Sequence, residues 1–275
     1  IVIGKATRLQ DYLLNSEKHY ELEVEFGYQT NSLDATGEVV REAEQPAEDV
    51  DINAAIESFL GEQVQTPPIF SAVKYKGRPL YEYARAGKAD DVPLEELSRH
   101  IEVYGMELLS KQVLGGKIKS VRLSISVSKG TYVRVIAFDL AQRLRSLGTL
   151  TALKRVRTAG VDQSACITLE RLIENPELYE ERLLPITHMP LDMGVLKFND
   201  LDKNHLVNGR PVKLTIDQAS DCVVKTKSDG DADSLLKSGE TVMLIDKYEK
   251  AIGLGSISRE DRSSGVMFIR KKRGL

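Results

Sequence analysis

The sequence lacks the residue types and motifs that carry cofactor chemistry. It has no tryptophan and two cysteines, Cys166 and Cys222, which cannot form a disulfide framework, so we expect a reducing compartment, the cytoplasm. No window approaches the roughly 20 consecutive apolar residues of a membrane helix. There is no phosphate loop, no Gly-x-Gly-x-x-Gly, no zinc-spaced Cys or His pair and no nucleophile elbow. We therefore expect no metal and no cofactor, and an enzyme of small-molecule metabolism is the poorest interpretation.

Charge alone does not indicate a nucleic-acid partner. The chain of 275 residues has 38 basic and 41 acidic side chains, a net charge of −3. The cations gather toward the C-terminus, which ends in the run Arg270-Lys271-Lys272-Arg273. Four adjacent cations favour a phosphate-rich partner, but a solvated tail explains them equally well.

Hydrophobic periodicity predicts both strands and helices in the first 194 residues. Alternation indicates strands over 20–28, 101–109, 119–128 and 149–156, and helical spacing indicates helices over 7–15, 53–60, 79–85, 133–146 and 168–175. Asp51 or Asn53 is the expected cap of the second helix, and 30–37 is polar and reads as a loop. Strands and helices do not alternate regularly, which favours an α+β fold with a mixed or antiparallel sheet.

The pattern changes near Val195. Short apolar runs over 212–216, 222–225, 242–245, 251–257 and 266–269 alternate with Gly, Asp and Asn turns. We predict two domains, 1–194 and 195–275, the second a small all-β module.

Three stretches combine basic and aromatic residues. The first is Lys18-His19-Tyr20, at the start of a strand. The second, Pro67 to Arg85, interleaves Lys and Arg with Tyr, a mixture that can hold phosphates and stack bases, although an ordinary amphipathic helix is also consistent with it. In the third, Ser128-Lys129-Gly130-Thr131-Tyr132-Val133-Arg134, a strand turns through a glycine into a helix. An arginine at that corner could be held rigidly and orient a carboxylate, or it could form a surface ion pair.

On these motifs, the chain resembles the TruB family of tRNA pseudouridine synthases over essentially its whole length. The resemblance rests on the order and spacing of the three stretches together with Ile3 to Arg8, Thr30 to Gly37 and Ala152 to Arg155. It implies a pseudouridine-synthase-like catalytic domain and a C-terminal PUA-like RNA-binding module.

The family resemblance implies isomerisation of uridine-55 in the tRNA T-loop, by base flipping and covalent attack of an aspartate, without cofactor or metal. On the matching positions, Tyr20 stacks on the flipped base and Arg134 pairs with the catalytic aspartate. Tyr132 and Leu153 line the pocket, and Lys74 faces RNA. We expect a monomer that binds the T-stem-loop of tRNA and does not bind a membrane.

The family's catalytic motif, Gly-x-Leu-Asp-Pro-x-Ala-x-Gly, does not occur in the sequence. The chain begins with Ile1, and we expect the true N-terminus, with the nucleophilic aspartate, to precede it. Asp34 matches a separate loop, Thr-x-Thr-x-Asp-x-x-Gly, where an Asp is expected to bond its own backbone rather than to act as nucleophile. The alternative is a catalytically inactive tRNA-binding fragment or tRNA-folding protein.

Overall fold

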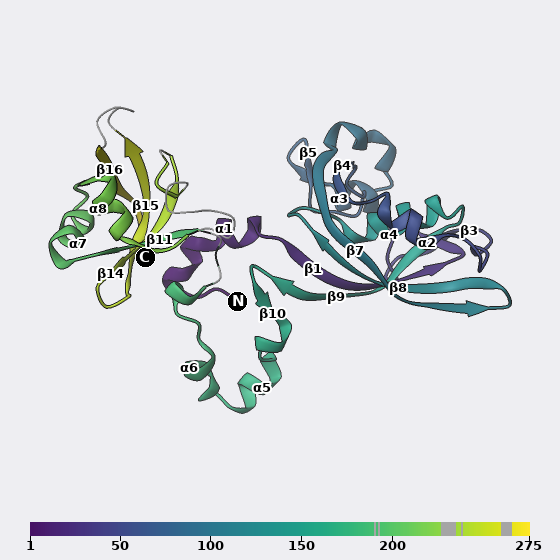
Figure 1. Cartoon of the computed structure of the whole chain (residues 1–275). Coiled ribbons are helices and arrows are strands. Elements are labelled where there is room, and N and C mark those ends of the chain that lie inside the picture. The colour runs from purple at the N-terminus through teal and green to yellow at the C-terminus, as the bar shows by residue number, and fades with distance from the viewer. Residues whose placement is uncertain (190, 192, 227–234, 238, 260–265) are drawn as a thin grey trace. The chain divides into compact units, whose positions relative to one another are not determined.

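The computed structural model describes the chain except residues 190, 192, 227–234, 238 and 260–265 (Figure 1). The described residues divide into two compact units. One is Asn15–Cys166, and the other joins Ile1–Leu14 to Ile167–Leu275.

The unit of residues 15–166 is built on one antiparallel sheet in the order β10-β9-β1-β8-β7-β4. The strands are β1 (Lys18–Phe26), β4 (Gly61–Gln65), β7 (Arg99–Leu114), β8 (Lys117–Val127), β9 (Gly148–Thr158) and β10 (Val161–Asp162). Strand β1 is an interior strand of this sheet, because it pairs with β8 on one edge and with β9 on the other.

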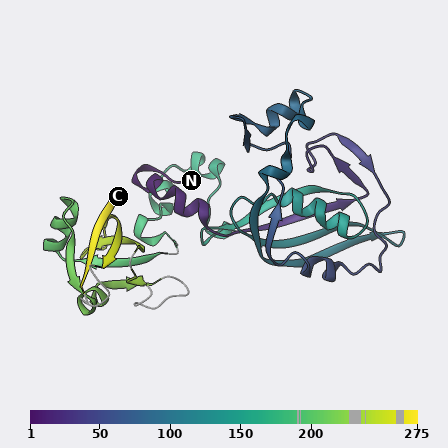
Figure 2. The same ribbon diagram turned by 90° about the horizontal axis from the view of Figure 1, so that it is seen from above.

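The alternating sequence of β1 puts Tyr20, Leu22, Val24 and Phe26 into the core, as the periodicity predicts. Helices α2 (Ile52–Glu57) and α4 (Val133–Arg143) contribute to the same core. Figure 2 shows α4 lying along the sheet. The close approach depends on Gly148 in β9, where an added Cβ would lie 2.7 Å from the Cβ of Ala141.

Smaller elements surround this sheet. They are the pair β2 (Tyr28–Thr30) and β3 (Val39–Glu42), the hairpin β5 (Lys74–Tyr75) and β6 (Arg78–Pro79), helix α3 (Leu80–Arg85), and the 3₁₀ turns Ala89–Asp91, Leu94–Leu97 and Gln163–Ala165. Asp51 caps α2 by accepting the Ala54 N–H over 3.0 Å, as one of the two predicted caps. Figure 2 shows the β5–α3 segment projecting from the sheet.

The second unit is a six-stranded sheet in the order β12-β16-β15-β14-β11-β13. Its strands are β11 (Gly194–Phe198), β12 (Val212–Thr215), β13 (Val223–Lys225), β14 (Thr241–Asp246), β15 (Ala251–Arg259) and β16 (Val266–Gly274). β11 and β14 are parallel and the other neighbours are antiparallel. The unit also holds a 3₁₀ helix (Gly4–Leu9), the helices α1 (Gln10–Asn15, which ends at the unit boundary), α5 (Leu169–Glu174) and α6 (Leu178–Arg182), and a 3₁₀ turn (Ile186–His188).

The all-β prediction for residues 195–275 is wrong. Two helices, α7 (Asp200–Val207) and α8 (Ile216–Asp221), lie between its strands. Asn199 caps α7, and Thr215 with Gln218 forms a capping box at α8. These local hydrogen bonds turn short polar stretches into helices that the apolar pattern does not indicate.

The division of the structure also differs from the predicted boundary at 194/195. Leu9 is completely buried, in a cluster with Met193, Val195 and Leu275. Arg273 Nη1 donates to the Arg8 carbonyl over 2.9 Å. Apolar burial and this side-chain-to-backbone hydrogen bond therefore place residues 1–14 in the unit of the C-terminal strands. The basic run 270–273 belongs to strand β16 and is not a free tail.

The predicted strands and helices of the α+β fold are otherwise present, with ends shifted by a few residues. No helix among the described residues is long and apolar enough to cross a membrane.

Candidate functional site

The loop between β2 and β3 is anchored to the central sheet through its backbone. The Ala35 N–H donates to the Leu150 carbonyl over 2.9 Å, and the Leu150 N–H donates to the Leu33 carbonyl over 3.1 Å. Leu33 adopts a left-handed φ of 67°, which an L side chain rarely takes. These bonds hold Asp34, which forms a parallel bridge with Leu150, at a fixed place beside β9.

Both oxygens of the Asp34 carboxylate accept hydrogen bonds. Its Oδ1 accepts from Ser32 Oγ at 2.8 Å, from the Thr36 N–H at 3.1 Å and from Thr36 Oγ1 at 2.6 Å. The bond to the Thr36 N–H is the local backbone contact expected of this residue. Gly37 allows the tight turn, because an added Cβ would collide with Ser32 Oγ.

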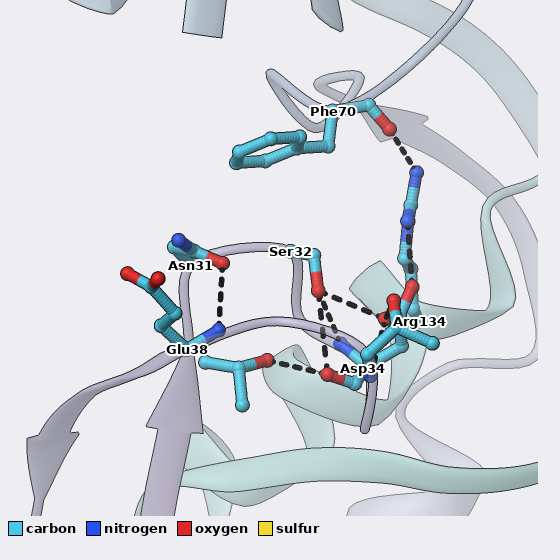
Figure 3. Close-up of polar contacts among 8 residues, drawn as sticks. Asn31, Ser32, Asp34, Glu38, Phe70 and Arg134 are labelled. Atoms are coloured by element: carbon cyan, nitrogen blue, oxygen red, sulfur yellow. Dashed lines mark hydrogen bonds and ion pairs between the residues drawn. The ribbon is translucent and has the colours of Figure 1, made fainter. Parts of the chain in front are cut away.

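Arg134 in the first turn of α4 closes the other side of this carboxylate (Figure 3). Its Nη1 lies 2.7 Å from Asp34 Oδ2, and its Nη2 donates to the Phe70 carbonyl. Both side chains are largely buried, 19% and 23% exposed. The guanidinium thus joins the 30–37 loop, helix α4 and the segment before β5.

The surroundings of Asp34 favour its ionised form. Burial alone would raise its pKa, but the hydrogen bonds from Thr36, Ser32 and Arg134 outweigh burial and hold the pKa below its ordinary value. Asp34 is therefore a carboxylate at neutral pH that accepts four hydrogen bonds, three at Oδ1 and one at Oδ2.

The backbone of Tyr132, the residue before α4, is fixed by Gln65 at the end of β4. The Tyr132 N–H donates to Gln65 Oε1 over 2.8 Å, and Gln65 Nε2 donates to the Tyr132 carbonyl over 3.2 Å. Gln65 is only 4% exposed. A buried amide that satisfies both polar groups of one peptide residue holds the strand-to-helix corner that presents Tyr132 and Arg134.

Two arginines flank the Tyr132 ring. The Cζ of Arg99 lies 5.2 Å from the ring centroid and the Cζ of Arg134 lies 5.8 Å from it. In the same unit Tyr20, 9% exposed, is opposite Arg155 on β9, whose Cζ lies 5.4 Å from the Tyr20 centroid.

The remaining predicted site residues occupy separate places. Leu153 is on β9, 48% exposed, and pairs with Leu22 of β1. Lys74 is exposed in the β5–β6 hairpin. Among the described contacts, neither of the two touches Arg134. A cavity of about 650 Å³ elsewhere in the unit, lined by residues such as Phe26, Tyr28 and Lys117, includes none of the predicted site residues.

The sequence interpretation missed two contributors. It paired Arg134 with an aspartate of a motif outside this sequence and did not anticipate Asp34, a hundred residues away, as its partner. Gln65 was not singled out, although a glutamine at the end of an extended segment was a possible signal.

The described residues contain no group of three or more His, Cys, Asp or Glu side chains placed to hold a metal.

Comparison with known proteins identifies the family. The model of the TruB family pseudouridylate synthase (N terminal domain) matches residues 1–133. The tRNA pseudouridine synthase B of Streptococcus mutans serotype c is 35% identical over 217 residues, 78% of this chain and 73% of the relative. That of Cronobacter sakazakii is 34% identical over 251 residues, 87% and 76% of the two chains.

Solved structures show the same fold at low identity. A crystal structure of a Cbf5-Nop10-Gar1 complex gives a TM-score of 0.61 at 19% identity, covering 92% of this chain and 64% of that one. A structure of an H/ACA RNP bound to a substrate RNA containing 2'-deoxyuridine gives 0.65 at 16% identity, covering 99% and 70%. The fold agrees with these structures, and the sequence relationship shows that the chain belongs to the TruB family of pseudouridylate synthases.

Proposed function

We propose that this protein is a tRNA pseudouridine synthase that converts uridine-55 of the T-loop to pseudouridine in the cytoplasm. Membership of the TruB family and relatives named tRNA pseudouridine synthase B support the reaction and the RNA substrate. The structural observation that carries the proposal is the guanidinium of Arg134, held between Asp34 and the Phe70 carbonyl at the start of α4.

Arg134 can orient a second carboxylate. Its described hydrogen bonds use one N–H of each Nη, and an arginine has further N–H donors. A guanidinium whose plane is fixed by two acceptors is suited to align a nucleophilic carboxylate with little loss of entropy. We propose that the nucleophile is the aspartate of the family motif Gly-x-Leu-Asp-Pro-x-Ala-x-Gly, which the 275 residues do not contain.

Asp34 itself is a poor nucleophile. Its two oxygens accept four hydrogen bonds, and attack on a nucleotide would sacrifice several of them. Its role in the proposal is to position Arg134.

Tyr132 supplies aromatic surface beside this centre, and Tyr20 is a second aromatic residue of the same unit. Flipping a uridine costs a few kcal/mol of unstacking, which stacking on a tyrosine ring can offset. In the expected reaction the C1′–N1 bond of the nucleotide breaks, the uracil turns, and a C5–C1′ bond forms; C5 then loses its proton and N1 takes one up, so that the product is an isomer of the substrate. Tyr20 is proposed to stack on the base and assist that proton transfer, and Leu153 to line the base pocket.

The projecting β5–α3 segment is the proposed contact with the RNA. Three cation–aromatic pairs stabilise it: Lys76 with Tyr75 (5.0 Å), Arg78 with Tyr83 (5.2 Å) and Arg85 with Tyr81 (5.3 Å). Exposed Lys74 at the start of β5 adds a further cation. We further propose that residues 195–275 act as a PUA-like RNA-binding module, and that the protein works as a monomer.

The test uses the chain preceded by an N-terminal segment with the family motif, here called the motif-bearing form. Incubated with tRNA transcripts, it should produce pseudouridine at position 55, located by carbodiimide treatment and primer extension. Modification of a different uridine would overturn the T-loop assignment. Tight tRNA binding with no modification at any site would favour the alternative, a tRNA-binding protein without chemistry.

A further inference from the structure

Four cations gather around the two candidate stacking tyrosines. Lys18 begins β1 opposite Val127 of β8, and Lys129 follows two residues after that strand ends. Arg155 faces the ring of Tyr20.

Arg99 completes the group at the start of β7. It faces the ring of Tyr132, and its Nη1 lies 3.3 Å from the place of a Cβ on Gly130. Strand pairing thus brings cations from β1, β7, β9 and the β8–α4 corner to one end of the sheet.

Three of these cations have no carboxylate partner among the described ion pairs. None of the ion pairs found among the described residues involves Arg99, Lys129 or Arg155. Lys129 Nζ donates instead to the neutral Asn15 Oδ1 at 2.8 Å. Other cations of the same sheet do have partners, such as Arg122 with Glu21 at 3.5 Å and Lys119 with Glu25 at 3.7 Å.

The clustering has an electrostatic consequence at Lys18. Burial lowers its pKa first, and the positive charges of Arg155 and Lys129 lower it further. Like charges held together in the free protein favour binding of an anion that relieves their repulsion.

We propose that Lys18, Arg99, Lys129 and Arg155 form a phosphate subsite for the RNA backbone on either side of the nucleotide that stacks at Tyr20. This inference rests on the proposed function, because it assumes an RNA substrate. Guanidinium and ammonium groups next to aromatic rings suit a nucleotide, with the phosphates on the cations and the base on a ring.

The test measures binding of the 275-residue chain to a T-arm hairpin RNA at several salt concentrations. The variant Lys129→Gln/Arg155→Gln removes two exposed cations of the cluster, and Lys119→Gln/Arg122→Gln removes two cations that already have carboxylate partners. Both variants change the net charge equally. For Lys129→Gln/Arg155→Gln, the slope of log affinity against log salt should fall in magnitude by about 1.4 to 1.8, the change expected from the loss of two phosphate contacts. The second should stay near the wild-type slope.

A second arm locates the contacts on the RNA. Replacing the two linkages that flank the target uridine by neutral methylphosphonates should weaken binding of the wild-type chain clearly more than binding of Lys129→Gln/Arg155→Gln, which keeps only Lys18 and Arg99 of the subsite. Equal slopes for the two variants, or wild-type affinity unaffected by the neutral linkages, would overturn the phosphate subsite while leaving the proposed function intact. Absence of hairpin binding by the wild-type chain would instead contradict the proposed function itself. If the double variant melts early, Lys129→Gln alone replaces it, with an expected slope change of about 0.7 to 0.9.

Discussion

Arg134 Nη1 and Asp34 Oδ2 lie 2.7 Å apart although a hundred residues separate them in sequence. The pair joins a loop whose backbone is bonded to β9 with a helix whose first turn is fixed by Gln65. Because both partners are anchored independently, the arginine has little freedom to leave its position.

Removing either partner should therefore affect chemistry more than binding. We expect Arg134→Ala in the motif-bearing form to abolish turnover while leaving tRNA affinity nearly unchanged, since Arg134 orients the nucleophile. Asp34→Asn, which keeps the shape but loses the charge, should lower single-turnover rate by about 100-fold, the effect of a misplaced catalytic group. Filter binding and tritium release measure the two quantities. Normal turnover by Arg134→Ala would end the assignment of that residue.

Tyr20 offers a second test, of stacking. Tyr20→Phe keeps the ring face and should retain more turnover than Tyr20→Leu, which fills the buried position without an aromatic face. Tyr20→Ala should lose turnover most, and it also costs about 3–5 kcal/mol of stability because the residue is largely buried. Single-turnover rates are compared at a temperature where thermal melting shows each variant folded. Equal single-turnover rates for Tyr20→Leu and the wild type would contradict the stacking role of Tyr20.

Gln65 allows a test of positioning in which the reaction rate of one variant depends on pH. Gln65→Met loses both bonds to Tyr132, whereas Gln65→Glu keeps the acceptor but loses the donor while ionised. Burial raises the pKa of such a carboxyl, and once protonated it can donate again. Both variants should lose about 10- to 100-fold in rate at neutral pH. The Glu variant alone should recover as the pH falls; superimposable pH profiles for the two would show that Gln65 does not act through Tyr132.

The ionised carboxylate of Asp246 leads to a prediction for the stability of the C-terminal sheet in acid. This carboxylate is 2% exposed and accepts from Lys203 Nζ at 2.7 Å and from the backbone N–H groups of Tyr248 and Lys250. The Lys203 bond is the main cause that lowers its pKa, and the backbone bonds add to it despite burial. Because the folded pKa is below the unfolded one, the stabilisation is present above about pH 4 and is lost as the pH falls through the folded pKa.

We expect Asp246→Asn to destabilise β14 and β15 at neutral pH by about 3 kcal/mol, measured by hydrogen exchange of their amides. The difference from wild type should shrink below about pH 4. Asp200→Asn is the control, because its partner Lys247 is on the surface and the pair is exposed. A destabilisation that persists unchanged in acid would mean that the charge of Asp246 is not its cause.

The sequence predicted what local patterns encode. Alternation located β1, and Asp51, one of two predicted caps, precedes α2, which begins one residue before the predicted Asn53. The edge strand β4 was missed because Gly61–Gln65 is mostly polar, as an exposed edge allows. Helix α8 was missed although Thr215 and Gln218 have capping-box spacing. The Arg134–Asp34 pair could not be read from the sequence, because tertiary packing alone brings those segments together.

The most direct test is release of tritium from C5 of uridine in tRNA under single-turnover conditions, for the 275-residue chain and for the motif-bearing form. We predict that the chain alone binds tRNA without release and that the motif-bearing form releases tritium. Release by the chain alone would assign the chemistry to a carboxylate within it, with Asp34 first to be tested. If the motif-bearing form is folded and binds tRNA but releases no tritium, the synthase function is contradicted.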